Sequence, residues 1–151
     1  MLYLWIFGNN IEDAMGHARF VVFYLVCGLA ASLAHALSNM GSTIPSVGAS
    51  GAISGVLGAY LLLYPRAQVL VLVPIFFFIR LMYIPAGFVL GLWFVLQILS
   101  SASTPTEGGG VAWFAHIGGF IAGMLLVGLF KRPSVRFFNE PQYHTRRIQE
   151  W

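Results

Sequence analysis

Long apolar stretches separated by short breaks dominate the chain. The stretches at residues 20–37, 48–64, 84–100 and 111–130 each approach the roughly 20 residues that a helix needs to cross a bilayer. The breaks between them are rich in Gly, Pro and small polar residues, which favour turns. The pattern therefore predicts that each apolar stretch is a membrane-spanning helix.

The apolar stretch that follows residue 68 is longer than one crossing. Pro74, Arg80 and Pro85 interrupt it. We therefore expect residues 69–83 to form an interfacial or re-entrant hairpin. The next span is expected to begin at Ile84, with Pro85 in the first helical turn, where its missing N–H group costs nothing.

The start of the chain is too short to be a span by itself. Residues 1–8 are apolar and read as the end of a spanning helix, which Asn9 and Asn10 close. Eight helical residues rise only about 12 Å, less than half of the roughly 30 Å hydrocarbon layer. Either this segment lies in the membrane interface or the beginning of the helix is missing, and we expect the second.

Composition excludes a soluble domain. Of the residues 58% are hydrophobic and 9% are charged, and the mean hydropathy is +0.81, whereas soluble domains carry about a quarter charged residues. The single cysteine, Cys27, lies in an apolar stretch and is expected to be a small buried residue. The net charge of +3 comes from basic residues whose positions fit the orientation of membrane helices, as the next paragraph describes. Nucleic acid is therefore not an expected partner.

Basic residues orient the predicted helices. When the breaks are assigned alternately to two sides, one side receives every Lys and Arg. These residues are Arg19, Arg66, Arg80, Lys131, Arg132, Arg136, Arg146 and Arg147. By the positive-inside rule this side is cytoplasmic. We expect a multi-pass protein of the cell (inner) membrane with a cytoplasmic C-terminus.

Two polar residues near the outer ends of predicted helices could do chemistry. Ser50 lies in Gly48-Ala49-Ser50-Gly51, and His116 begins a second helix that also runs inward. Counted at 1.5 Å per residue, both lie in the same leaflet. A neutral imidazole within reach could take the proton of the serine hydroxyl, which predicts a Ser-His dyad. Backbone N–H groups of residues 49–51 could then stabilise an oxyanion.

Purely structural roles for Ser50 and His116 remain open. Ser is a common helix cap, and a histidine inside a span can be a packing residue. His35 also lies near the outer face and is a rival base, whereas His17 and His144 fall on the cytoplasmic side. Since no Cys, Asp or Glu clusters with a histidine at ligand spacing, no metal or cofactor is expected.

Glycines four residues apart predict close helix packing. The pairs Gly51 with Gly55 and Gly119 with Gly123, and the pair Ser54 with Gly58, are small residues at this spacing. Such stripes would let the serine and histidine helices approach each other closely.

Together these motifs resemble the rhomboid intramembrane serine proteases. Residues 48–51 resemble the nucleophile motif of that family, and Ala115-His116-Ile117-Gly118-Gly119 resembles its histidine motif. Residues 3–8 with Glu12 and Gly16 resemble the end of the family's second helix. The stretches 65–66, 84–86 and 91–94 resemble its fifth helix and the linker that precedes it. The resemblance covers almost all of residues 1–130.

The resemblance implies a fold and an activity. The fold would be an all-α, polytopic helical bundle over residues 1–130 that lacks the first helix and part of the second, followed by a basic tail at 131–151. The activity would be cofactor-free hydrolysis of a peptide bond in or near a substrate's transmembrane helix. Ser50 would be the nucleophile and His116 the base, then the acid. Trp93 and Phe94 would lie on a lateral gate for the substrate.

Departures from the family keep a second reading open. Family members place a His and an Asn on the second helix to hold the oxyanion, and the Asn would fall just before Met1. Ser54 stands where some members have a tyrosine. An inactive rhomboid-like protein that binds transmembrane helices is therefore the alternative. A small transporter finds little support, because the spans lack the charges that ion coupling uses.

Overall fold

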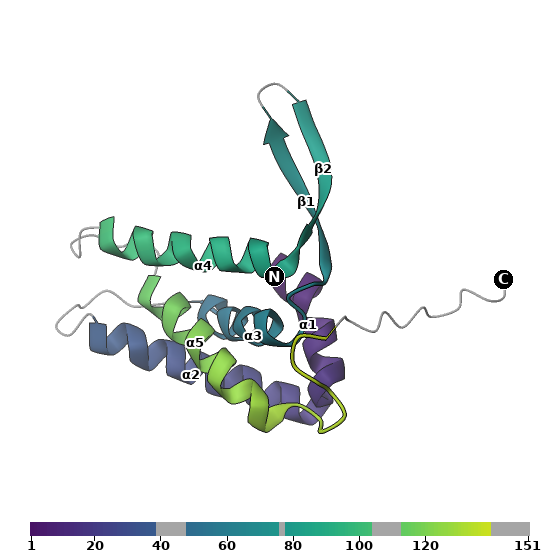
Figure 1. The fold of residues 1–151 in the computed structure, drawn as a ribbon. Helices are drawn as coiled ribbons and strands as arrows, with labels where there is room; N and C mark the ends of the chain where they lie inside the picture. The colour runs from purple at the N-terminus through teal and green to yellow at the C-terminus, as the bar shows by residue number, and fades with distance from the viewer. Residues whose placement is uncertain (39–47, 76–77, 104–112, 140–151) are drawn as a thin grey trace.

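The fold is a small bundle of helices with one β-hairpin projecting from it (Figure 1). The computed structural model describes residues 1–38, 48–75, 78–103 and 113–139. Its elements, in chain order, are α1 (Leu2–Met15), α2 (His17–Ser38), α3 (Ser50–Leu63), β1 (Gln68–Ile75), β2 (Phe78–Pro85), α4 (Ala86–Ser103) and α5 (Trp113–Phe130).

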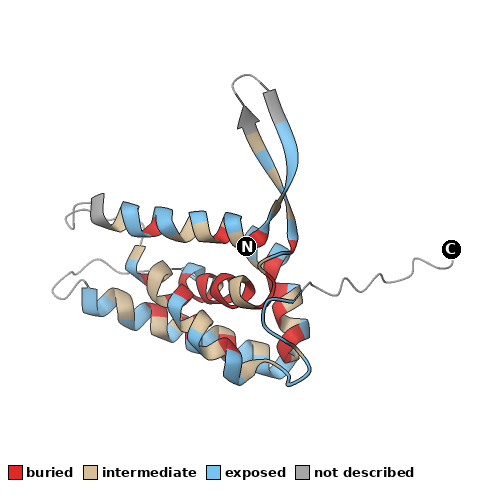
Figure 2. Cartoon of the chain, in the orientation of Figure 1, coloured by how far each residue is buried: buried red, intermediate tan, exposed pale blue. Residues whose placement is uncertain are grey.

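Helix α3 forms the centre of the bundle. Figure 2 shows it as the most continuously buried element, with the other helices around it. It spans 14 residues, about 21 Å, whereas α2 spans 22 residues, about 33 Å. Since the hydrocarbon layer is roughly 30 Å thick, α3 is too short to reach both surfaces of a bilayer.

Glycine lets α3 and α5 touch backbone to backbone. These helices run parallel, with Gly119 against the carbonyl oxygen of Gly51 and Gly123 against that of Gly55. A Cβ atom on either α5 glycine would overlap the α3 oxygen that it faces. Such close approach through small residues is typical of helices in membranes.

Helix α2 also packs on Gly51 and Gly55 and runs antiparallel to α3. A Cβ atom on Gly51 would lie 2.5 Å from the Cβ of Ala31, and one on Gly55 would lie 2.6 Å from the Sγ of Cys27. Cys27 is fully buried at this contact, as the sequence predicts.

Among the residues that the structure describes, α2 and α5 are long and apolar enough to span a membrane, and residues 50–63 and 86–101 form shorter apolar helical stretches. Their outward side chains are apolar too. Exposed examples are Leu25, Leu29 and Leu33 on α2, Phe88, Leu92 and Leu96 on α4, and Leu125 and Leu129 on α5. This surface is one that a bilayer covers and water does not.

The prediction that Asn9 and Asn10 end the first helix is wrong. Helix α1 continues to Met15 and stops at Gly16, whose φ of 90° suits glycine. The helix continues because Ile11 and Met15 bury their side chains in the core. Asn10, which directly precedes Ile11, donates a hydrogen bond of 3.1 Å to the Tyr60 hydroxyl. Helix α2 consequently starts at His17 rather than at residue 20.

The expected hairpin exists, but it is made of β-strands. Antiparallel β1 and β2 pair from Gln68 with Pro85 to Ile75 with Phe78. The alternating Val and Leu residues at 69–73 favour a strand. The all-α prediction therefore needs correction, although the fold is mostly helical. Pro85 ends β2 instead of lying in the first turn of the helix, and α4 runs from Ala86 to Ser103, past the predicted end at residue 100.

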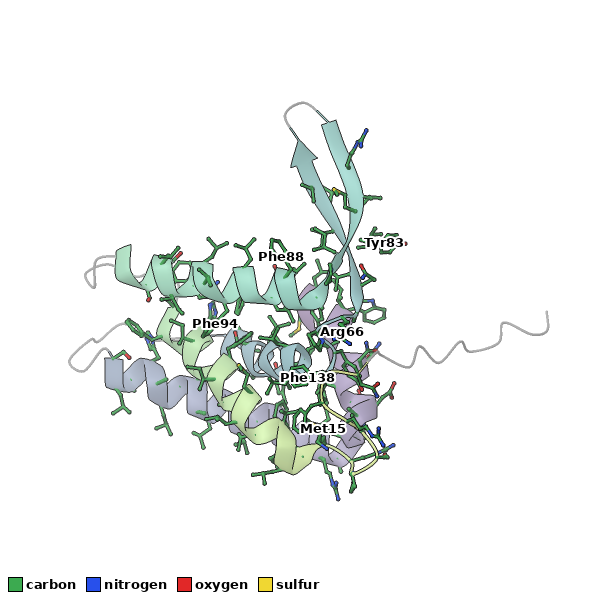
Figure 3. All side chains as sticks on the ribbon, in the orientation of Figure 1. Met15, Arg66, Tyr83, Phe88, Phe94 and Phe138 are labelled. Atoms are coloured by element: carbon green, nitrogen blue, oxygen red, sulfur yellow. The ribbon has the colours of Figure 1, made fainter. Side chains whose placement is uncertain are left out.

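The ends of α1, α3 and α5 meet at one end of the bundle. The N–H of Arg132 donates to the carbonyl of Ala14 over 2.8 Å, and the N–H of Phe138 donates to Leu62 over 3.0 Å. Figure 3 shows the labelled Met15, Arg66 and Phe138 gathered there. We call it the basic end, because the elements that meet there carry Arg19, Arg66, Lys131, Arg132 and Arg136.

Several sequence expectations fall outside the described residues. They concern the loops at 39–47 and 104–112, which include the predicted start of the last span at 111–112, and the tail at 140–151 with His144, Arg146 and Arg147. The described start of the tail, residues 131–139, folds back onto α3.

Candidate active site

Ser50 is the first residue of α3 and is exposed. The turn that precedes it needs glycine, since Gly48 has a φ of 148°. The first helical hydrogen bond runs from the N–H of Ile53 to the carbonyl of Ala49, over 3.0 Å. The N–H groups of Ser50, Gly51 and Ala52 therefore have no acceptor within the helix, and no side chain caps it at Ala49.

His116 lies in the first turn of α5 and is half-buried. Its neighbour Ala115 and the next-turn residue Gly119 both pack on Gly51. A Cβ atom on Gly51 would lie 3.4 Å from the carbonyl oxygen of Ala115. Gly51 directly follows Ser50, so the candidate nucleophile and base each adjoin a point where α3 and α5 pack together.

A third polar residue, which the sequence reasoning missed, contacts His116. The side-chain oxygen of Gln97 on α4 lies 2.8 Å from His116 Nδ1, and Gln97 is only 7% exposed. An amide oxygen accepts hydrogen bonds, so this contact assigns the ring proton to Nδ1 and leaves the Nε2 lone pair as the basic site. The signal for it was a single amide in the apolar stretch 86–100.

Aromatic rings pack α4 against α5 around the histidine. The Trp93 ring lies 6.0 Å from His116 and 5.9 Å from Phe120, measured between centroids. Phe94 stacks on Phe120 at 4.4 Å, and Figure 3 shows the labelled Phe94 between α4 and α5. Both residues that the resemblance assigns to a lateral gate therefore face α5.

The remaining polar candidates have other surroundings. The Ser54 hydroxyl is buried and donates to the carbonyl of Ser50 over 2.8 Å. His35 is half-buried near the end of α2, next to Ala34, which packs on Gly118. His17 contacts Glu12 at the start of α2. Within the described part of the chain, no three His, Cys, Asp or Glu residues gather as a metal site would require.

Comparison with known proteins identifies the family. Residues 1–133 match the rhomboid domain. The chain is 31% identical over 134 residues to "Rhomboid protein 1, mitochondrial" of Saccharomyces cerevisiae, covering 83% of this chain and 35% of the relative. It is 31% identical over 141 residues to "RHOMBOID-like protein 1" of Arabidopsis thaliana, covering 93% and 32%.

A shorter but closer match is to "Rhomboid protease GluP" of Bacillus subtilis, with 47% identity over 60 residues, which are 40% of this chain and 11% of the relative. The chain thus spans at most about a third of the length of these curated relatives. No solved structure matches it significantly. Because the family match covers most of the sequence, the chain belongs to the rhomboid family of polytopic helical membrane proteins.

Proposed function

We propose that this protein is an intramembrane serine endopeptidase that uses Ser50 and His116 as a catalytic dyad. The observation that carries the proposal is the packing of Gly51 against Ala115 and Gly119, since these contacts hold the starts of α3 and α5 together. Membership of the rhomboid family, with a relative named as a protease, supports the same reaction.

The reaction follows from the roles of the two side chains. Nε2 of His116 takes the hydroxyl proton as Ser50 Oγ attacks the substrate carbonyl carbon. The N–H groups of residues 50–52 donate to the oxyanion that forms on the carbonyl oxygen. His116 then gives the proton to the leaving amine as the C–N bond breaks. Water, deprotonated by His116, releases the acyl group from Ser50.

Gln97 acts as a positioning residue in this scheme. By accepting a hydrogen bond from Nδ1–H of His116, it keeps the lone pair on Nε2, where the serine proton must go. Trp93 packs beside the same imidazole and limits its rotation. A neutral amide therefore takes the orienting part that an aspartate plays in a triad.

The proposed substrate is a transmembrane helix. Because α3 is shorter than the hydrocarbon layer, its first residue lies below one membrane surface when its other end lies at the opposite one. We assign the basic end to the cytoplasm, so cleavage would take place near the outer face. A substrate helix that enters beside α4 would have to separate Trp93 and Phe94 from α5.

Cleavage of a fluorogenic transmembrane peptide by the purified protein in vesicles tests this proposal. We expect Ser50→Ala and His116→Ala to abolish cleavage, and Ser32→Ala, which alters an exposed serine of α2, to retain it. Undiminished cleavage by Ser50→Ala would overturn the nucleophile assignment. A wild-type protein that crosslinks to the peptide without cutting it would instead support the helix-binding alternative.

A further inference from the structure

The hairpin of β1 and β2 exposes an apolar face. Leu70 pairs with Tyr83 and Leu72 pairs with Leu81, so these four side chains share one face of the two-stranded sheet. Their exposed fractions run from 50% for Leu70 to 71% for Tyr83. In these two pairs the Tyr83 hydroxyl is the only polar side-chain group.

The opposite face is apolar as well, apart from one charge. Val71 pairs with Met82, and Val73 pairs with Arg80. Met82 is 45% exposed and Arg80 is exposed. A two-stranded sheet is marginally stable in water by itself, and an exposed apolar ribbon with free edges invites association. The side chains on both faces are therefore more stable in an apolar environment. The charged Arg80 side chain needs an anion or water beside it.

The base of the hairpin is fixed to the bundle. The N–H of Ala86 donates to the carbonyl of Ala67 over 2.7 Å, and the N–H of Gly87 donates to that of Pro65 over 2.8 Å. These bonds join the start of α4 to the segment between α3 and β1. The hairpin consequently leaves the basic end from a defined point.

The direction of the hairpin suits a position along a membrane surface. Figure 1 shows that it leaves the bundle crosswise to α4. In Figure 3 the exposed Phe88 of α4 lies on the side toward which the hairpin projects. The apolar surface of α4, which includes Leu92 and Leu96, therefore continues into the hairpin at an angle, and lipid that covers one also reaches the other.

Charge indicates which lipids would be favoured. Within the described segments, six basic residues belong to the basic end and the hairpin, namely Arg19, Arg66, Arg80, Lys131, Arg132 and Arg136, against the acids Glu12 and Asp13. Glu12 is already in contact with His17. Anionic headgroups would complement this excess of positive charge. Tyr83 and Arg80 are also residue types that favour the membrane interface.

We propose that the hairpin at residues 68–85 lies in the headgroup–acyl boundary of the leaflet at the basic end, where Arg80 and Arg66 bind the phosphates of anionic phospholipids. Through its hydrogen-bonded base the hairpin anchors that end of α4 to the bilayer. This inference does not depend on the proteolytic activity.

Fluorescence quenching in vesicles tests the location. A single cysteine replaces Leu72 in a Cys27→Ala background and carries a nitrobenzoxadiazole probe. Matched positions are Leu92→Cys, on the exposed apolar face of α4, and Ser134→Cys, an exposed residue after α5. We expect spin-labelled acyl chains to quench the probe at 72 as they do at 92, and aqueous iodide to quench only the probe at 134.

Two results would overturn the proposal. Iodide quenching at 72 as strong as at 134 would place the hairpin in water. Protection from both quenchers would mean that protein, either a second copy or another partner, covers it. Leu81→Cys, the cross-strand partner of Leu72, repeats the measurement independently, and retained thermal unfolding in the same vesicles shows that each variant folds.

A second experiment tests the preference for anionic lipid. It compares spin-labelled phosphatidylglycerol with spin-labelled phosphatidylcholine as quenchers of the probe at position 72. Arg80→Gln should lower the preference for phosphatidylglycerol about five-fold, the equivalent of about 1 kcal/mol for one basic residue near an anionic surface. Arg136→Gln, which lies outside the hairpin, should leave it unchanged. An unchanged preference in Arg80→Gln, or its loss on adding inorganic phosphate to the buffer, would contradict recognition of lipid headgroups.

Discussion

Nδ1 of His116 on α5 lies 2.8 Å from the side-chain oxygen of Gln97 on α4. The helix that carries the candidate base is thus tied by a buried hydrogen bond to the helix that the resemblance assigns to substrate entry. A movement of α4 would break this bond and release the imidazole. If His116 is the base that we propose, the position of α4 would affect its orientation.

Gln97→Leu should reduce kcat far more than it changes KM. The variant removes the acceptor for Nδ1–H, so the ring is no longer held in the tautomer and orientation that the reaction needs. A misplaced catalytic group can cost about 100-fold in rate, and we expect a loss of that order in vesicle assays. Gln97→Glu, which keeps an acceptor oxygen, should recover most of the activity. Equal activity of Gln97→Leu and wild type would remove Gln97 from the mechanism.

Gly123→Ala should destabilise the fold. The added methyl group would overlap the carbonyl oxygen of Gly55 and force α3 and α5 apart, and overpacking of this kind costs about 1–3 kcal/mol. Thermal unfolding in detergent measures the effect. Gly91→Ala on α4 is the matched control, because a Cβ atom there meets nothing within 4 Å. Similar melting temperatures for the two variants would show that the α3–α5 contact is looser than described.

Gly48→Ala should impair activity more than stability. Its φ of 148° lies in a region that residues with a side chain rarely adopt, so in the variant the exposed turn before Ser50 would shift to relieve the strain. Gly48 is exposed, and the core packing is untouched. We expect cleavage to fall about 100-fold with a small change in melting temperature. The control is Gly128→Ala, where a Cβ atom makes only an ordinary contact of 3.7 Å with Phe137. Full activity of Gly48→Ala would separate this turn from catalysis.

Thiol labelling checks the orientation. In a Cys27→Ala background, a cysteine at Ser103, the last residue of α4, should react with an impermeant maleimide added to intact cells. A cysteine at Ser134, at the basic end, should react only after the membrane is permeabilised, because positively charged segments stay in the cytoplasm. The opposite pattern would invert the orientation and move the proposed site of cleavage to the cytoplasmic face.

Much of the bundle could be predicted from the sequence, because a helix that crosses a membrane needs a long run of apolar residues. The spans expected at 20–37 and 48–64 match α2 and α3 to within three residues at each end. The hairpin was recognised from Pro74, Arg80 and Pro85, but its strand character was not. Apolar runs of this length fit either a strand or a buried helix segment.

The errors arise where tertiary contacts override local signals. Asn10 looked like a helix end because asparagine favours turns, yet its amide is satisfied by the Tyr60 hydroxyl and the helix continues. Gln97 was overlooked because one polar residue does not change the hydropathy of an apolar stretch. The role proposed for Gln97 depends on its contact with His116, which is 19 positions away in the sequence.

A fluorophosphonate probe, which reacts with an activated serine hydroxyl, tests whether Ser50 is a nucleophile activated by His116. The protein, folded in membranes, should form a covalent adduct with the probe. Ser50→Ala and His116→Ala should abolish the adduct, whereas Ser32→Ala should leave it intact. An adduct that persists in Ser50→Ala, or wild-type protein that melts normally yet never reacts, would contradict the claim.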